Sequence, residues 1–261
     1  MTISLFQAVL IGLWTAFCFS GMLLGIYTNR CIVLSFGVGI ILGDIPTALA
    51  MGAISELAYM GFGVGAGGTV PPNPIGPGVF GTLMAITSAG KVTPEAALAL
   101  STPIAVGIQF LQTTAYTLNA GAPGLAVKYL RAGQLNKFKR STNGTILTFI
   151  VIGFSLGFLG AFSMDALLKL VEAIPPVLLT GLSVAGKMLP AIGFAMILSV
   201  MAKKELIPYV LLGYVCAAYL QLPVIGIAIV GSIFALKEFF NKPAAGTAGP
   251  ARQEEAHDDW I

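Results

Sequence analysis

Long apolar runs, separated by short polar breaks, dominate this chain from its first residues to about residue 240. A helix needs about 20 apolar residues to cross the hydrocarbon core of a bilayer. Most of the runs are long enough, so the pattern predicts several membrane-spanning helices. The runs cover residues 3–27, 31–62, 79–90, 95–118, 145–162, 184–202 and 206–236.

Polar breaks in the first half predict where helices begin. The break GDIP (43–46) predicts a helix that Asp44 caps, with a proline in its first turn, and that runs to Gly61. The sequence TPE (93–95) predicts a second start. Its threonine suits the cap, its proline suits the first helical position, and its glutamate suits the positive end of the helix. This helix opens the run to Leu118.

The second half predicts a helix of another kind. SMDALLKLVEAI (163–174) is amphipathic, which is typical of a helix lying along a membrane surface. Residues 177–201 are apolar, and we expect them to be interrupted. Further spans over 206–220 and 222–240 follow. The interrupting residues are Gly181, Gly186 and Pro190.

One stretch, GVGAGGTVPPNPIGPG (63–78), breaks the apolar pattern, because ten of its sixteen residues are Gly or Pro. A bare peptide group in lipid costs several kcal/mol, so non-helical backbone at membrane depth must be surrounded by protein or line a wet cavity. The short flanking segments favour a re-entrant hairpin beside a solute path. A loop outside the membrane is the alternative.

Composition strengthens the membrane assignment. Of the 261 residues, 56% are hydrophobic and 10% are charged, and the mean hydropathy is +0.89. A soluble domain carries roughly a quarter charged residues. The first apolar segment lacks a basic start and is too long for a removed leader, so we expect it to remain as a span.

Charge placement predicts orientation. KYLRAGQLNKFKR (128–140) contains five basic residues and no acidic residue, and Lys203 and Lys204 form a second basic cluster. Cytoplasmic loops of membrane proteins carry such an excess of Lys and Arg. We therefore expect a basic cytoplasmic loop over residues 119–143. Orientation in the bilayer accounts for these charges without nucleic-acid binding.

Residues for catalysis are scarce. The only histidine, His257, lies in a Pro- and Gly-rich tail, and Cys18, Cys31 and Cys216 show neither zinc spacing nor a CxxC pair. No phosphate-binding loop of the P-loop type is present. The sequence predicts no catalytic residue, no metal site and no cofactor on this chain, so any phosphoryl chemistry belongs to another chain.

Two polar side chains mark the region of the Gly- and Pro-rich stretch. Glu56 lies in an otherwise apolar helix, where an ionisable group is costly and usually functional. It could instead bond exposed amides of the stretch. Asn73, between prolines, offers hydrogen-bond donors and acceptors of the kind that sugar hydroxyls need. A turn-forming role is the alternative.

Further polar residues lie inside apolar runs. Gln7, Gln109 and Gln112 are uncharged amides, and each alone is explained by a helix–helix hydrogen bond. Together they favour a neutral, hydroxyl-rich ligand. Lys187 lies deep in an apolar run, where it could pair with an acid such as Glu56, reach the membrane surface, or bind a ligand.

Four segments resemble the IIC permease subunit of the mannose–fructose–sorbose family of the bacterial phosphoenolpyruvate-dependent sugar phosphotransferase system. They are LGDIPTALAMGAISELAYMG, GAGGTVPPNPI, STPIAVGIQF and GLSVAGKMLPAIGFAMIL, and the resemblance extends from about residue 3 to 240. PPNPI resembles the branch that handles N-acetylgalactosamine more than the mannose branch, in which an acid replaces Asn73. Lys187 departs from the family, where a small residue is expected.

The resemblance implies an all-α integral membrane protein, a multi-span helical bundle with broken helices and re-entrant hairpins. Residues 1–240 would form the polytopic permease domain and 241–261 a disordered cytoplasmic tail. Family members pair with a IID membrane chain, as trimers of heterodimers, in the bacterial inner membrane. They carry a hexose or amino sugar by an elevator-like movement, and soluble IIA and IIB components transfer the phosphoryl group through histidines.

By matching, Glu56, Asn73 and Gln109 fall in the core region expected to meet the sugar, and Lys187 falls in a second hairpin. Gln7 joins the predicted substrate-binding set through its amide chemistry. Two other functions stay open. One is a free-standing, ion-coupled transporter with Glu56 or Asp44 as its ion site. The other is a structural or receptor subunit whose partner holds the ligand.

Overall fold

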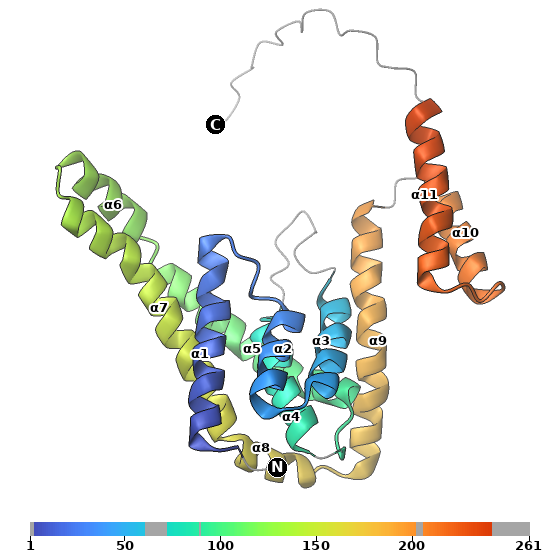
Figure 1. Cartoon of the computed structure of the whole chain (residues 1–261), viewed down its shortest axis with the longest axis horizontal. Coiled ribbons are helices and arrows are strands. Elements are labelled where there is room, and N and C mark those ends of the chain that lie inside the picture. Colours follow the sequence, from blue (N-terminus) through green and yellow to red (C-terminus); the bar gives the residue numbers. More distant parts are fainter. Residues whose placement is uncertain (1–2, 61–71, 89, 202–205, 242–261) are drawn as a thin grey trace, which may run out of the picture. The chain divides into compact units, whose positions relative to one another are not determined.

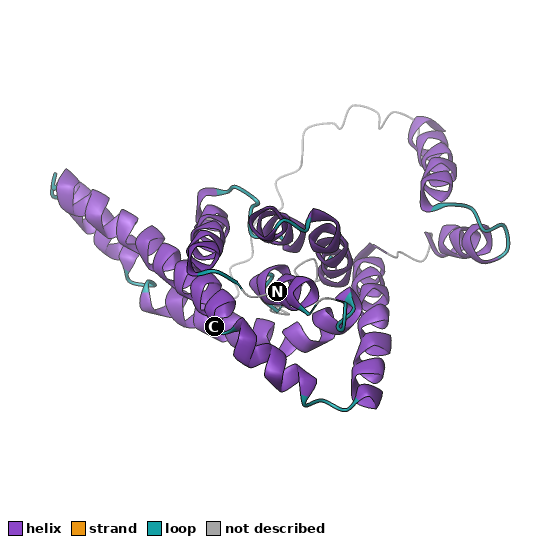
Figure 2. Ribbon diagram, turned by 60° about the horizontal axis from the view of Figure 1, so that its bottom comes forward, coloured by secondary structure: helices purple, strands orange, loops and turns teal. Residues whose placement is uncertain are grey.

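The computed structural model describes residues 3–60, 72–88, 90–201 and 206–241, and within these ranges the chain is helical with no strand. Figure 2 shows helices joined by short loops. The predicted all-α fold class is confirmed. The chain divides into two compact units, Met1–Val200 and Met201–Ile261.

Helices α1 (Leu5–Gly21) and α7 (Leu135–Phe162) pack closely against each other (Figure 1). Small residues make the close approach possible. A Cβ atom on Gly153 would lie 2.9 Å from the Cα atom of Ala16, and Gly157 faces Thr15. Gly153 and Gly157 form a GxxxG pattern, which lets the backbones of two helices meet inside a membrane.

Helices α2 (Cys31–Leu42) and α3 (Ile45–Tyr59) form a short antiparallel pair. Gly43 ends α2 in the left-handed conformation, with φ of 80°, and Asp44 caps α3 by accepting the N–H of Thr47 at 3.2 Å. The predicted cap of α3 is therefore confirmed. At 1.5 Å per residue the two helices span about 18 and 22 Å, less than the ~30 Å hydrocarbon core.

The end of the Gly- and Pro-rich stretch, together with the helical chain that continues from it, is buried. A π-helix, η2 (Gly76–Gly81), continues into α4 (Thr82–Thr87), and every residue of both is buried. A Cβ atom on Gly76 would lie 2.7 Å from the Cα atom of Ala105. Protein thus surrounds Asn73 and residues 75–78, the described end of the expected hairpin tip, as the re-entrant interpretation requires. Residues 63–71 of that tip lie outside the described residues.

Helix α5 (Pro94–Leu118) begins where predicted, because Thr93 accepts the N–H of Ala96 at 3.3 Å. The predicted basic loop over residues 119–143 is wrong. Helix α6 (Ala122–Arg131) and the first part of α7 occupy that segment and pack together (Figure 1). Lys, Arg, Leu and Ala favour helix, and the helical backbone satisfies its own hydrogen bonds, so basic charge alone does not predict a loop.

Helix α8 (Met164–Glu172) confirms the predicted amphipathic helix. The expected interruption of residues 177–201 is wrong, because α9 (Pro176–Met201) is one continuous helix through Pro190. Two of its glycines serve close packing instead. Gly186 meets the backbone of Glu95, and Gly193 meets that of Ala58. Neighbouring helices commonly make Gly and Pro tolerable inside membrane helices.

The second unit contains α10 (Ile207–Ala218) and α11 (Val224–Asn241). They meet at the predicted break, where Gln221 has a φ of 48°, and the rings of Tyr209 and Phe234 pack 5.7 Å apart. The expected tail beyond Asn241 lies outside the described residues.

Four helical segments are long and apolar enough to cross a membrane, by length and composition. Many large apolar side chains on these segments are exposed, which suits contact with lipid rather than water. The chain is therefore a membrane protein. The four segments are Leu5–Leu24, Pro94–Arg131, Leu135–Phe162 and Pro176–Ser199.

Candidate functional site

Asn73 starts the buried helix. Its side chain is 0% exposed, and its Oδ1 atom accepts the N–H of Ile75 at 3.0 Å. Its backbone carbonyl accepts the N–H of Gly76 at 3.0 Å, and its backbone N–H donates to the carbonyl of Ala105 in α5 at 3.1 Å. These bonds confirm the turn-forming role that the sequence left as an alternative.

The remaining end of the Asn73 side chain meets a second amide. Asn73 Nδ2 donates to the Oε1 atom of Gln112, a buried residue of α5. Gln112 Nε2 then reaches only the Tyr116 Oη atom at 3.5 Å and the Met22 Sδ atom at 3.9 Å. Thioether sulfur is a weak acceptor. The Gln112 Nε2 group is therefore a donor without a strong acceptor in the described part of the chain.

Asn29 brings another amide to the same sulfur. Its Nδ2 atom donates to Met22 Sδ at 3.6 Å, and its buried Oδ1 atom has no hydrogen-bond partner in the described part of the chain. Leaving a buried acceptor unsatisfied costs about 1–3 kcal/mol, so such an atom needs an explanation. We call four polar side chains the amide cluster: Asn29, Gln112 and Tyr116, which lie around Met22, and Asn73, which joins them through Gln112.

Local structure assembles the cluster from α5, η1, the loop before α2 and the segment before η2. Gln112 and Tyr116 are four residues apart on α5 and therefore share one face of that helix. Met22 opens η1 (Met22–Leu24), which ends α1, and Gly25 then turns the chain with a φ of 74°. Thr28 Oγ1 donates to the Cys18 carbonyl at 2.9 Å. This bond holds the loop before α2 against α1.

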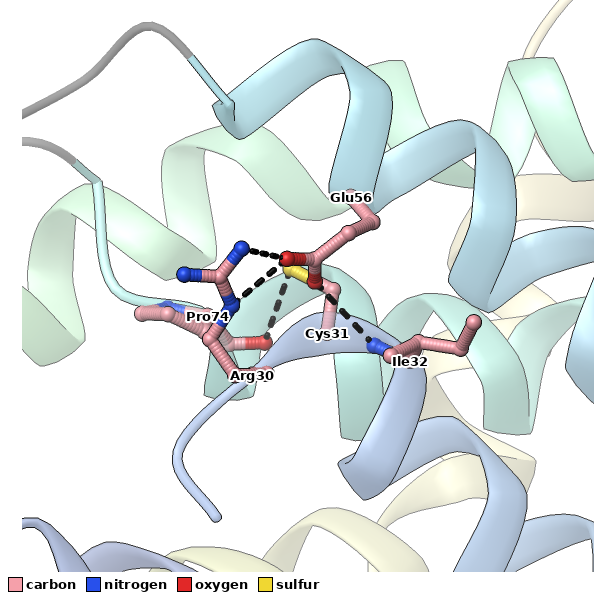
Figure 3. A network of polar contacts seen from close by, with 5 residues as sticks. All are labelled: Arg30, Cys31, Ile32, Glu56 and Pro74. Carbon is pink, nitrogen blue, oxygen red and sulfur yellow. Dashed lines mark hydrogen bonds and ion pairs between the residues drawn. The ribbon is translucent and has the colours of Figure 1, made fainter. Parts of the chain in front are cut away.

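Glu56 forms an ion pair with Arg30, at the start of α2 (Figure 3). Arg30 Nε donates to Glu56 Oε1 at 2.5 Å, and the backbone N–H of Ile32 donates to Oε2 at 3.4 Å. The carboxylate thus also lies at the positive end of a helix. The side chains are 19% exposed for Glu56 and 50% for Arg30. Glu56 therefore binds Arg30 and the first turn of α2. The amides of the Gly- and Pro-rich stretch that it could also bond, over residues 63–71, lie outside the described residues.

The ion pair and the amide cluster are neighbours through the chain. Asn29 directly precedes Arg30, and Asn73 directly precedes Pro74, whose carbonyl lies 3.9 Å from Cys31 Sγ in Figure 3. The pair cancels its own charge. What remains near the cluster is a set of uncharged donors and acceptors, which suits a neutral ligand with several hydroxyl groups better than an ion.

The other predicted residues differ in their placement. Gln109 lies one turn before Gln112 on α5, half-buried, and its side chain makes no hydrogen bond within the described ranges. Gln7 Nε2 donates to the Ile41 carbonyl at 3.4 Å, which is the helix–helix bond that the sequence left open. Ile41 is ten residues beyond Cys31 on α2, so Gln7 lies about 15 Å along that helix from the cluster's end.

Lys187 does not pair with Glu56, whose carboxylate is taken by Arg30. It is exposed on α9 beside Gly186, which packs on the backbone of Glu95. Glu95 is seventeen residues before Gln112 on α5, a separation of about 25 Å along the helix. The structure therefore does not bring Lys187 to the amide cluster, and α9 contains no second hairpin in which it could act.

Sequence reasoning did not assign Asn29, Arg30, Tyr116 or Met22. Two signals could have found most of them. The polar triplet TNR (28–30) separates two apolar runs, and Gln112 and Tyr116 have the four-residue spacing of one helix face. As for a metal, no three His, Cys, Asp or Glu side chains gather among the residues that the structure describes.

Comparisons with known proteins agree with this picture. A family model described as PTS system sorbose-specific IIC component matches residues 5–237. The N-acetylgalactosamine permease IIC component 1 of Escherichia coli K12 is 34% identical over 182 residues, which are 68% of this chain and 66%, just under two thirds, of that relative. The sorbose-specific EIIC component of Lacticaseibacillus casei is 27% identical over 207 residues, covering 78% of this chain and 74% of that protein.

Two solved structures are similar over most of the chain. A structure described as a membrane protein has a TM-score of 0.82 at 25% identity and covers 92% of this chain and 98% of its own. A complex of the mannose transporter ManYZ with microcin E492 has a TM-score of 0.56 at 25% identity. The similarity covers 93% of this chain and 98% of the chain in that complex.

Proposed function

Because this chain belongs to the sorbose-type IIC component family of the phosphotransferase system, we propose that it carries a hexose or amino sugar across the membrane. As a IIC permease component it is a transport subunit. The phosphoryl donor in this proposal is a soluble IIB partner on the cytoplasmic side of the bacterial inner membrane. Soluble IIA supplies IIB, and a IID chain completes the membrane complex, as a trimer of heterodimers.

The amide cluster carries the proposed sugar site. Sugar hydroxyls both donate and accept hydrogen bonds, and the cluster offers Asn29 Oδ1 as an acceptor and Gln112 Nε2 as a donor. The cluster lies where short helices end at the Gly- and Pro-rich stretch. Broken helices of this kind mark substrate sites in transporters. Gln109 would add an amide, Asn73 would hold Gln112 in place, and Glu56 would hold the start of α2 beside the site.

Gln7 and Lys187 are not part of this proposed site. Gln7 joins α1 to α2, and Lys187 lies on α9 beside the start of α5. The elevator-like movement is also part of the proposal. It rests on the family to which the chain belongs.

Titration of the purified IIC–IID complex with N-acetylgalactosamine, mannose and sorbose tests the function. We expect saturable binding of at least one of these sugars and phosphoenolpyruvate-dependent uptake when IIA and IIB are supplied. The free-standing alternative predicts a different result. Vesicles that hold this chain alone would accumulate unmodified sugar under an ion gradient, and that outcome would overturn the proposal.

A further inference from the structure

The hairpin formed by α6 and the start of α7, residues 122–144, carries an unusual concentration of positive charge, and we call it the basic arm. Its five basic side chains are all exposed, and no acidic residue occurs in the sequence between Glu95 and Asp165. The side chains are those of Lys128, Arg131, Lys137, Lys139 and Arg140.

The arm extends beyond the hydrocarbon core of the membrane. Helix α7 has 28 residues, about 42 Å at 1.5 Å per residue, which exceeds the ~30 Å hydrocarbon core. Its apolar part starts at Ile146, where Thr145 Oγ1 donates to Asn119 Oδ1 at 3.4 Å and so ties α7 to the end of α5. Lys137 lies nine residues before Ile146, about 13 Å away along the helix. The headgroup layer on each side is only about 5–8 Å thick.

The arm is also preformed. Helix α6 packs along α7, and the Lys137 Nζ atom lies 5.9 Å from the centre of the Tyr129 ring. The turn between the helices is closed by Gly133, with a φ of 68°, and by a hydrogen bond from the Gln134 N–H to the Tyr129 carbonyl at 2.9 Å. A rigid surface of this kind loses little entropy when a partner binds.

Exposed apolar side chains stand among the charges, namely Leu125, Leu130 and Leu135. Leu130 and Leu135 flank the turn at the far end of the arm, beyond the hydrocarbon core, so contact with acyl chains does not explain these two side chains. Apolar side chains ringed by basic groups are typical of a protein interface with charge complementarity. The positive-inside rule places this surface on the cytoplasmic side.

We propose that the basic arm docks the soluble phosphocarrier domain, through an acidic surface around its phosphorylated residue. This inference rests on the function proposed above, and it identifies the surface of this chain that binds the IIB partner. The phosphoryl group adds negative charge, so the phosphorylated carrier binds the arm more tightly than the unphosphorylated carrier. Electrostatic docking also speeds encounter at low salt.

The test uses the full chain with its IID partner in vesicles of phosphatidylcholine, with the phosphorylated IIB protein of the same system as probe. In the variant K128E/K137E/K139E, the IIB concentration that gives half-maximal sugar phosphorylation rises about tenfold at low salt. The sugar dissociation constant and the rate at saturating IIB stay unchanged. The difference between variant and wild type shrinks as salt is raised.

Two controls separate charge from folding. The variant K128R/K137R/K139R keeps the charge and stays within about twofold of wild type. Lys169→Glu reverses an exposed charge on α8, which follows the opposite end of α7, and leaves the IIB dependence unchanged.

An unchanged IIB dependence in the glutamate variant, with sugar binding intact, overturns the docking surface and leaves the proposed function standing. An effect seen only in vesicles that contain phosphatidylglycerol means that the arm binds anionic lipid, which also overturns it. If the wild-type complex shows no IIB-dependent sugar phosphorylation, both the proposed function and the docking surface are refuted.

Discussion

The unsatisfied Asn29 Oδ1 atom allows a test in which stability and ligand binding change in opposite directions. Asn29→Leu replaces the amide with an apolar side chain of similar volume. It removes a buried acceptor that has no partner in the described part of the chain, and the only bond that it breaks is the weak 3.6 Å contact with Met22 Sδ. We therefore expect the complex to gain about 1 kcal/mol of stability.

The same substitution removes a proposed sugar ligand. A neutral hydrogen bond contributes about 0.5–1.5 kcal/mol, so sugar affinity should fall about two- to twelvefold. Thermal unfolding of the purified IIC–IID complex measures the first effect, and isothermal titration with the preferred sugar measures the second.

Asn119→Leu is the matched control, because both ends of that amide are used. Asn119 Nδ2 donates to the Ala115 carbonyl at 2.8 Å, and Oδ1 accepts from Thr145 at 3.4 Å. This variant should lose stability and keep its sugar affinity. If Asn29→Leu binds sugar as tightly as the wild type, Asn29 is not a ligand and the reasoning from its unpaired oxygen is refuted.

Three further predictions follow from the packing and the polar contacts. Asn73→Ala should abolish measurable sugar binding in titration, because Gln112 loses its anchor, while size-exclusion chromatography still shows the IIC–IID complex. Glu56→Gln should retain more transport than Glu56→Ala, because the single amide oxygen still accepts one of the two bonds, from Arg30 or from Ile32; equal losses would indicate a requirement for charge. Gly153→Val should cost about 1–3 kcal/mol of stability in thermal unfolding, since its side chain meets the backbone of α1, and an unchanged melting temperature would contradict the close packing.

Helix starts were predictable from the sequence because their bonds are local. The Asp44 and Thr93 side chains each accept the N–H of a residue three positions ahead, so their chemistry is visible in a few letters. The character of residues 119–143 and of α9 was not predictable in this way. Packing of α6 on α7, and of Gly186 and Gly193 on other helices, decides those segments, and no short window of sequence contains both partners.

The candidate site was predictable only in part, for the same reason. Asn73 and Glu56 stand out as polar residues in apolar surroundings, yet their partners are far away in sequence. Arg30 is 26 residues from Glu56, and Gln112 is 39 residues from Asn73. The unpaired oxygen of Asn29 exists only because folding buries it without a donor, so it could be recognised only in three dimensions.

A structure of the IIC–IID complex with bound sugar tests the central claim most directly. We expect sugar oxygens within hydrogen-bonding distance, about 2.7–3.2 Å, of Asn29 Oδ1 and Gln112 Nε2. Sugar bound elsewhere, with Asn29 Oδ1 still unpaired or bonded only to protein, would contradict it.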